Sequence, residues 1–239
     1  MRVALALLAA AALVGGSAMP ALASPPRADR VVAAAWTAGG FPLPLNPNYR
    51  TVHFRLYADG RLVTPNGADV HEVPAYRVAQ LPSSGARALR QDLNRATSNV
   101  DFGFVPVADV GYTYVRVAHD GRTAYTSINA LTMTYGLTRS QREARKRLST
   151  LIDSTADVSG RAFQPESYEV RRIAADDPTI QLEWTGPDLP ATSCGLIAAN
   201  AYADFPATYR QGNSYTWRGE AFTLWLRPLL PGETGCRGL

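Results

Sequence analysis

The sequence predicts an α+β protein: a mostly antiparallel sheet built from hairpins, with two or three helices packed on it. Two observations lead to this prediction. Short alternating segments are joined in pairs by glycine-containing turns, a pattern that indicates hairpins. Two longer segments carry apolar residues at helical spacing behind capping signals. Hairpins and helices alternate along the chain, which favours helices laid on one face of an antiparallel sheet.

Three hairpins are predicted. Asp59-Gly60 and Asp120-Gly121 tolerate the positive φ angles of a two-residue type I′ turn, and Arg218-Gly219-Glu220 forms the third turn. The paired segments are residues 52–58 with 61–64, 112–119 with 122–128, and 214–217 with 221–227. Further strands are expected at residues 31–37, 168–173 and 180–184.

Two helices have clear start signals. Ser83 or Ser84 can cap a helix that runs to about residue 97. Thr138 and Gln141 form a capping box for the second helix. The inward stripes are Ala86, Leu89, Leu93 and Ala96 in the first helix, and Ala144, Leu148, Leu151 and Thr155 in the second. A third helix is expected at residues 201–209, where Pro206 would interrupt it.

Residues 1–23 are predicted to be a signal peptide. Arg2 precedes an unbroken apolar run over residues 3–14, and small residues then lead to Ala21-Leu22-Ala23. The run is shorter than the roughly 20 residues that span a bilayer, so we expect cleavage and release, with no membrane span afterwards. Residues 24–30 form a flexible lead-in. Residues 31–239 form one α+β domain, with two loosely duplicated lobes, 31–100 and 101–239, as an alternative division.

Two cysteines, Cys194 and Cys236, lie in the exported part of the chain. An even count in an oxidising compartment predicts one disulfide. It would close a loop of about 40 residues, for which the chain-entropy model gives roughly 4 kcal/mol of stabilisation. A nucleophilic cysteine is the alternative, but it would leave the other thiol unpaired, and no histidine lies near either in the sequence.

The net charge is +4, yet Lys146 is the only lysine. Such an arginine bias, together with abundant Ala, Gly and Pro, is typical of GC-rich coding, so we do not expect nucleic acid as a partner. The most basic run, Arg139, Arg142, Arg145, Lys146 and Arg147, is interpreted mainly as the solvated face of an amphipathic helix. An electrostatic contact with an acidic partner is the alternative.

No catalytic, metal or cofactor motif is evident. His71-Glu72 resembles half of a zinc-helix motif, but Ala75 stands where the second histidine would be. The carboxylate pairs Asp153 with Asp157 and Asp176 with Asp177 could serve a glycosidase only at a separation that the sequence does not give. We therefore predict no cofactor and no metal site, and name no catalytic residue.

The candidate binding residues lie on one face of each of the first two hairpins. With a two-residue turn, Arg116 lies opposite Tyr125 and Tyr114 opposite Ser127, and Val115 and Val117 point to the other face. In the first hairpin Val52, Phe54, Leu56 and Val63 are expected on one face and His53, Arg55 and Tyr57 on the other. The predicted partner-binding residues are Arg55, Tyr57, Tyr112, Tyr114, Arg116 and Tyr125. Tyrosine and arginine are enriched in protein interfaces; packing under helices is the alternative. Trp217 and Trp225 are expected in the core rather than stacked on envelope sugars.

Two segments carry a resemblance to a known group of proteins. Residues 224–236 read LWLRPLLPGETGC and residues 56–61 read LYADGR. This pattern resembles uncharacterised secreted proteins of high-GC actinobacteria, which have no established activity. The resemblance implies export and the disulfide, and it carries over no functional residue.

These observations favour a secreted binding or interaction module that acts at or outside the cell envelope. Its partner would be an extracellular protein or an envelope component. An extracellular hydrolase of unidentified substrate is the alternative, and a structural envelope protein is a third. A flat Tyr/Arg patch would favour binding, whereas a deep pocket with converging Asp, His or Ser would favour the enzyme.

The exported protein is expected to begin at Ser24, because the Ala-Leu-Ala site after the apolar run is the form that signal peptidase cuts. Mass spectrometry of the natively exported protein measures this N-terminus. An extracellular form that begins at Met1 would contradict the export prediction.

Overall fold

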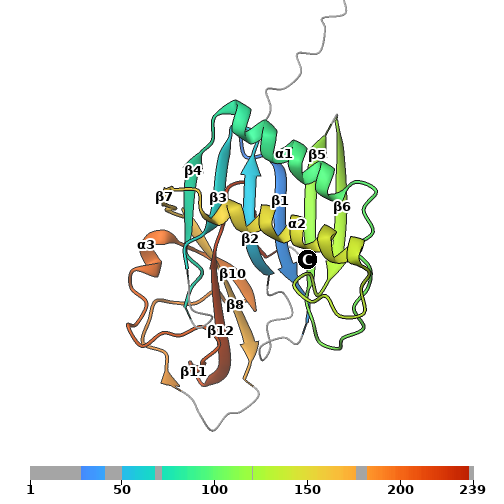
Figure 1. Ribbon diagram of the computed structural model, residues 1–239. Helices are drawn as coiled ribbons and strands as arrows, with labels where there is room; N and C mark the ends of the chain where they lie inside the picture. The colour runs from blue at the N-terminus through green and yellow to red at the C-terminus, as the bar shows by residue number, and fades with distance from the viewer. Residues whose placement is uncertain (1–27, 41–49, 68–71, 120, 176–181, 237–239) are drawn as a thin grey trace, which may run out of the picture.

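The computed structural model describes residues 28–40, 50–67, 72–119, 121–175 and 182–236. The predicted signal peptide, His71, Asp120, Asp176 and Asp177 lie outside these ranges. The described chain forms three helices and two sheets, so the α+β prediction is confirmed. Sheet A has the strand order β6-β5-β1-β2-β3-β4-β7, and sheet B has the order β10-β8-β12-β11-β9 (Figure 1).

The strands of sheet A are β1 (Val31–Ala38), β2 (Arg50–Tyr57), β3 (Arg61–Pro65), β4 (Tyr76–Gln80), β5 (Tyr112–His119), β6 (Arg122–Asn129) and β7 (Arg161–Ala162). Those of sheet B are β8 (Ser167–Ala174), β9 (Leu182–Glu183), β10 (Cys194–Ala198), β11 (Ser214–Trp217) and β12 (Glu220–Pro228). All three predicted hairpins are confirmed. Sequence reasoning missed β4, β7 and β10, and the two sheets do not follow a boundary at residue 100, because β5 and β6 pair beside β1.

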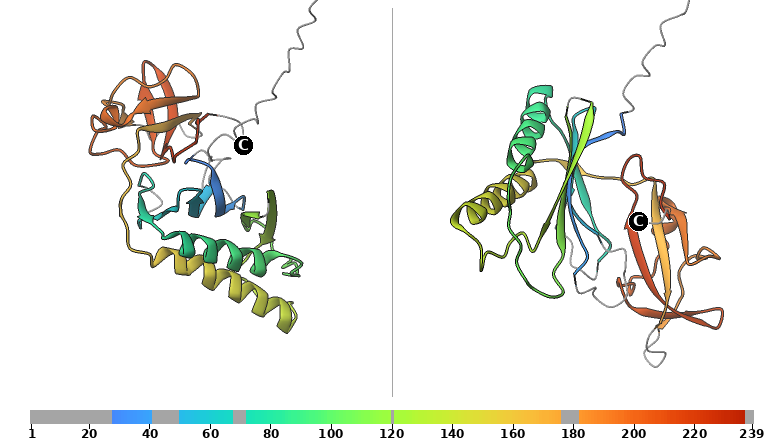
Figure 2. Two further views of the ribbon diagram at one scale, coloured as in Figure 1. Left: turned by 90° about the horizontal axis from the view of Figure 1, so that it is seen from above. Right: turned by 90° about the vertical axis from the view of Figure 1, so that its right-hand side faces the viewer.

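Helices α1 (Ser83–Thr97) and α2 (Arg139–Ala156) cover one face of sheet A (Figure 2). Their predicted stripes pack against Ala33, Ala35, Phe54, Leu56, Val115 and Val117 in the main core. Alternation along the strands explains this, because every second side chain of a strand reaches the same face. No helix among the described ranges is long and apolar enough to cross a membrane.

The helix ends follow the predictions only in part. The capping box of Thr138 and Gln141 is present at α2. At α1 the cap position is Pro82, which makes no side-chain hydrogen bond, so the prediction of a serine cap is wrong. The third helix, α3 (Ala199–Tyr202), is a single turn that ends before Pro206. A proline lacks the backbone donor that a longer helix would need.

Sheet B packs on the opposite side of sheet A from the helices (Figure 2). The half of that face formed by β2, β3 and β4 is covered by the C-terminal segment, residues 229–236. There Val52, Tyr57, Val63 and Tyr76 are buried with Leu230 of this segment. Seen from above, β5 and β6 lie on the side away from sheet B (Figure 2). Among the described residues, one half of this face of sheet A is therefore closed and the other half is not.

The register of the first hairpin differs from the prediction. Arg55 pairs with Val63 and Leu56 with Leu62, so three residues, not two, connect the strands. Gly60 takes the positive φ of +89° that such a loop places at its last position. Because a shift of one residue moves every side chain to the other face, Val63 lies with Arg55 and Tyr57, not with Phe54.

A second irregularity separates Val52 from Phe54. The pairing of β1 with β2 shifts between Ala35 and Trp36, where Ala35 faces Phe54 and Trp36 faces Val52. His53 is the additional residue of this bulge, and its Nε2 lies 2.8 Å from Thr37 Oγ1. Burial lowers the pKa of His53, with a smaller opposing effect from Asp153. The predicted place of Val52 beside Phe54 is thus wrong, because a bulge adds one residue to the strand.

Arg145 of α2 is the largest fully buried side chain, with 1% of its surface exposed. Its guanidinium donates to the carbonyls of Phe102, Gly103, Asn129, Ala130 and Met133. The interpretation of the basic run as solvated is therefore wrong for this residue, and burial lowers its pKa. Ala130, which accepts one of these hydrogen bonds, lies in a left-handed turn with a φ of +44°. The side chain fastens the segment before β5 and the turn after β6 to the helix.

Replacing Arg145 with methionine should lower the free energy of unfolding by about 3 kcal/mol or more. The reason is that several buried carbonyls lose their donor, at about 1 to 3 kcal/mol for each group left unsatisfied. The free energy of unfolding of Arg145→Lys should lie between those of the wild type and Arg145→Met, since an ammonium has fewer donors than a guanidinium. Urea unfolding measures the loss. Arg147→Met, at an exposed position of the same helix, is the control and should stay within about 0.5 kcal/mol; equal values for Arg145→Met and Arg147→Met would refute the role.

Candidate functional site

The second hairpin has the predicted register and supplies most of the candidate site. Arg116 pairs with Tyr125 and Tyr114 with Ser127. Val115 and Val117 are buried under the helices. Tyr112, Tyr114, Arg116 and Tyr125 therefore lie on the opposite face, on the half of sheet A that sheet B does not cover.

Strand β1 adds Trp36, which sequence reasoning missed. Trp36 lies opposite Tyr114, and their rings stack with centroids 5.5 Å apart and planes inclined by 13°. A tryptophan inside an alanine-rich strand was the available signal. The guanidinium of Arg50 lies 5.9 Å from the ring of Trp36, and that of Arg116 lies 5.9 Å from the ring of Tyr125. Both are within the range of cation–π attraction.

We call this set the aromatic surface: Trp36, Arg50, Tyr112, Tyr114, Arg116 and Tyr125. Tyr125 is 65% exposed and Tyr112 is 39% exposed, whereas Trp36, Tyr114 and Arg116 are half-buried. Trp36 and Tyr114 stack on each other, and Tyr112 lies beside Tyr114. Tyr125 lies against Arg116. Such a surface offers contact area with little further loss of side-chain freedom.

Arg116 has no carboxylate partner among the described residues. Its Nε is buried without a hydrogen-bond acceptor, and its described contact is the ring of Tyr125. Strands β1, β2, β5 and β6 contain no aspartate or glutamate. The aromatic surface therefore carries positive charge that these four strands do not neutralise.

Arg55 and Tyr57, the other two predicted binding residues, lie on the same face but in its closed half. Arg55 forms an ion pair of 2.6 Å with Glu233. Tyr57 is fully buried, and burial raises its pKa to about 12, against smaller lowering effects from Arg55. Neither residue belongs to the exposed surface, because the C-terminal segment covers them.

Arg55 is one end of an ion network that joins sheet A to sheet B. Glu233 also binds Arg227 Nη1 at 2.6 Å and accepts from the backbone N–H of Leu230 at 3.0 Å. Arg227 continues through Nη2 to Glu169 at 2.8 Å. Side chains of alternating charge thus link β2 to the C-terminal segment, then to β12 and then to β8.

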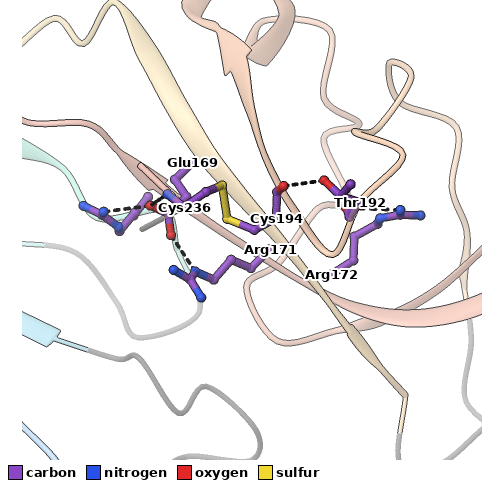
Figure 3. The surroundings of a disulfide bond; sticks show 7 residues. Glu169, Arg171, Arg172, Thr192, Cys194 and Cys236 are labelled. Atoms are coloured by element: carbon purple, nitrogen blue, oxygen red, sulfur yellow. Dashed lines mark hydrogen bonds and ion pairs between the residues drawn. A yellow bond between two sulfur atoms is a disulfide. The ribbon is translucent and has the colours of Figure 1, made fainter. Parts of the chain in front are cut away.

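Glu169 is 2% exposed and lies beside the disulfide (Figure 3). It accepts from Arg171 and, at 2.9 Å, from the backbone N–H of Cys236. Cys236 is bonded to Cys194 of β10, with an S–S distance of 2.11 Å and a Cα–Cα distance of 5.7 Å. The predicted disulfide is confirmed, and it fixes the same C-terminal segment that the ions hold.

Both carboxyl groups of the network have lowered pKa values. Burial alone would raise the pKa of Glu233, but Arg55 and Arg227 outweigh it. Burial also opposes ionisation of Glu169, and Arg171, Arg227 and the Cys236 N–H outweigh it. Both groups are therefore ionised in the folded protein near neutral pH.

Three open hollows lie elsewhere on the described surface. One of about 420 Å³ lies along α2 beside Arg142 and Lys146, and another of about 340 Å³ lies between the Asp59-Gly60 turn and α1. The third, of about 440 Å³, is lined by Trp217, Arg218 and Glu183, among others. The described ranges contain no group of three or more His, Cys, Asp or Glu side chains that could hold a metal ion.

The two tryptophans of the last hairpin differ in burial. Trp225 is 7% exposed and belongs to the core, as predicted. Trp217 is half-buried and lies between Arg218, at 4.3 Å from its ring centroid, and Arg172, at 5.6 Å. Arginine thus covers both tryptophan and tyrosine rings in this protein.

No model of a known protein family and no curated protein sequence matches this chain. The candidate site accordingly depends on the geometry above.

Stability should fall on acidification because of the two network carboxyls. Their folded pKa values lie below the ordinary 4.5, so their contribution is fully present above about pH 5 and is lost as the pH falls through 4.5 and below. The double variant Glu169→Gln/Glu233→Gln, though less stable at pH 7, should lose less stability between pH 6 and about pH 3 than the wild type. Urea unfolding across this range measures the slope of the free energy of unfolding against pH for each protein. Exposed Glu143→Gln on α2 is the control, and equal slopes for wild type and the double variant would contradict the expectation.

Proposed function

We propose that this protein is a secreted binding module and that the aromatic surface contacts an extracellular protein partner. The observation that carries the proposal is the uneven cover on one face of sheet A. The β2–β4 half is buried with Leu230 of the C-terminal segment, whereas the β5–β6 half presents Tyr112 and Tyr125 to solvent. Exposed tyrosine, tryptophan and arginine gathered in one place are characteristic of protein interfaces.

Export is the second part of the proposal. It is supported by the apolar leader with its Ala-Leu-Ala site and by the disulfide Cys194–Cys236, since disulfides persist mainly in oxidising compartments. The partner would then be a protein at or outside the cell envelope. In the part of the chain that the structure describes, no observation favours the hydrolase alternative.

Truncating both exposed rings, Tyr112→Ala/Tyr125→Ala, should leave stability within about 0.5 kcal/mol per site. It should reduce capture of the partner by about tenfold or more, as expected when interface anchors of about 1 kcal/mol each are lost. Pull-down from culture medium and envelope extracts with the oxidised protein, quantified by mass spectrometry, measures capture.

Tyr135→Ala is the matched control for this test, because Tyr135 is 54% exposed but lies outside the aromatic surface. Proteins that bind wild type and Tyr135→Ala but not the double variant identify the partner. An unchanged set of captured proteins, or capture of envelope polysaccharide alone, would refute the proposal of a protein partner at this surface.

A further inference from the structure

Strand β6 is a long open edge of sheet A. It pairs with β5 over all eight of its residues and lies at the end of the strand order; Figure 1 shows it at the right-hand side of the sheet. The other sheet edges of the described chain are shorter. Strands β7 and β9 have two residues each, and β10 has five and is fastened by the disulfide.

Most of this edge is accessible. Residues 122–125 and 127 are exposed and Thr126 is half-buried. At the C-terminal end of β6, Asn129 is buried. Its side chain accepts a hydrogen bond from the N–H of Val105 and donates one to the carbonyl of Val105. Alternate residues of an outer strand direct their N–H and C=O groups away from the sheet, so residues 122–127 offer a row of backbone donors and acceptors.

Strand β6 carries one of the usual protections of an edge strand, the charge of Arg122 at its turn end. The segment contains no lysine or proline, and its pairing with β5 has no bulge. Thr123, Tyr125 and Thr126 are residues that favour strands. Natural proteins commonly block such an edge with charge, proline or a bulge. Here only Arg122 at one end does so, and the remaining edge beside exposed aromatic rings fits a place where another strand pairs.

The charge near the edge indicates what kind of strand it accepts. Arg116 and Arg122 have no described ion-pair partner, and Arg116 lies across from Tyr125 on the aromatic surface. A second copy of this chain would bring further arginine and no carboxylate to this edge, because β5 and β6 contain no aspartate or glutamate. A six-residue edge also buries much less than the roughly 1,000 Å² of a stable interface between folded proteins.

We propose that an extended, acidic segment of the partner adds to sheet A as a strand beside β6. Main-chain hydrogen bonds supply affinity, and carboxylates at alternate positions lie on the side of the aromatic surface. The carboxylate beside Tyr125 faces the charge of Arg116, which lies one strand further in. This inference rests on the proposed function and names the chemistry of the partner at the same surface.

The probe is a blocked octapeptide of alternating glutamate and valine, titrated into the mature, oxidised, ¹⁵N-labelled protein. Amide shifts and slowed hydrogen exchange should concentrate in β6 and appear at every second residue. The corresponding lysine and valine peptide should bind at least about tenfold more weakly, and so should a glutamate and valine peptide N-methylated on the edge that faces β6. Arg116→Ala/Tyr125→Ala should weaken the unmethylated peptide by a similar factor, whereas Tyr135→Ala should not.

Absence of binding at about 1 mM peptide, shifts that avoid β6, or equal binding of the N-methylated peptide would each overturn strand addition. Self-association of the free protein through β6, measured by sedimentation and by protection of the same amides, would overturn it in favour of a second copy. Loss of natural-partner capture in Tyr112→Ala/Tyr125→Ala, together with failure of the peptide test, would reject strand addition and leave the binding function standing. Failure of both would reject both.

Discussion

The structure depends on the ion network around the C-terminal segment. Arg227 joins Glu169 of sheet B to Glu233, and Glu233 reaches Arg55 of sheet A. The disulfide ends this segment at Cys236, next to Glu169. Glu169 is 2% exposed, and a buried charge is costly unless its partners are present. Through Glu233 and Arg55 the network joins sheet B to the covered half of sheet A.

This arrangement creates the candidate site by leaving part of sheet A free. The same face carries Tyr57 of β2 in its closed half and Tyr125 of β6 in its open half. One is fully buried and the other is 65% exposed. The difference is not in the strands themselves but in what packs on them. On the helix side, Arg145 plays the corresponding organising role, because its donors fix the segments that lead into β5 and out of β6.

Sequence reasoning was most successful where local chemistry decides the structure. The capping box of Thr138, the three hairpins and the Asp120-Gly121 register follow from turn and cap preferences that act within a few residues. Sequence reasoning failed where a shift of one residue in register decides which face of the sheet a side chain occupies. The three-residue loop at Gly60 and the bulge at His53 each reverse the alternation, and neither follows from the apolar pattern. Arg145 was misplaced because periodicity treats every arginine as solvated.

The sequence by itself determined the α+β class, the hairpins, the disulfide pairing of two cysteines, and four of the six residues of the aromatic surface, since these follow from local backbone preferences and from counting. Only the tertiary structure decided which tyrosines are exposed, that Trp36 and Arg50 join them, and that β6 is the open edge. The physical reason is that exposure depends on contacts between segments far apart in the chain. Here the C-terminal segment covers Tyr57 of β2, whereas Tyr112 of β5 and Tyr125 of β6 are exposed.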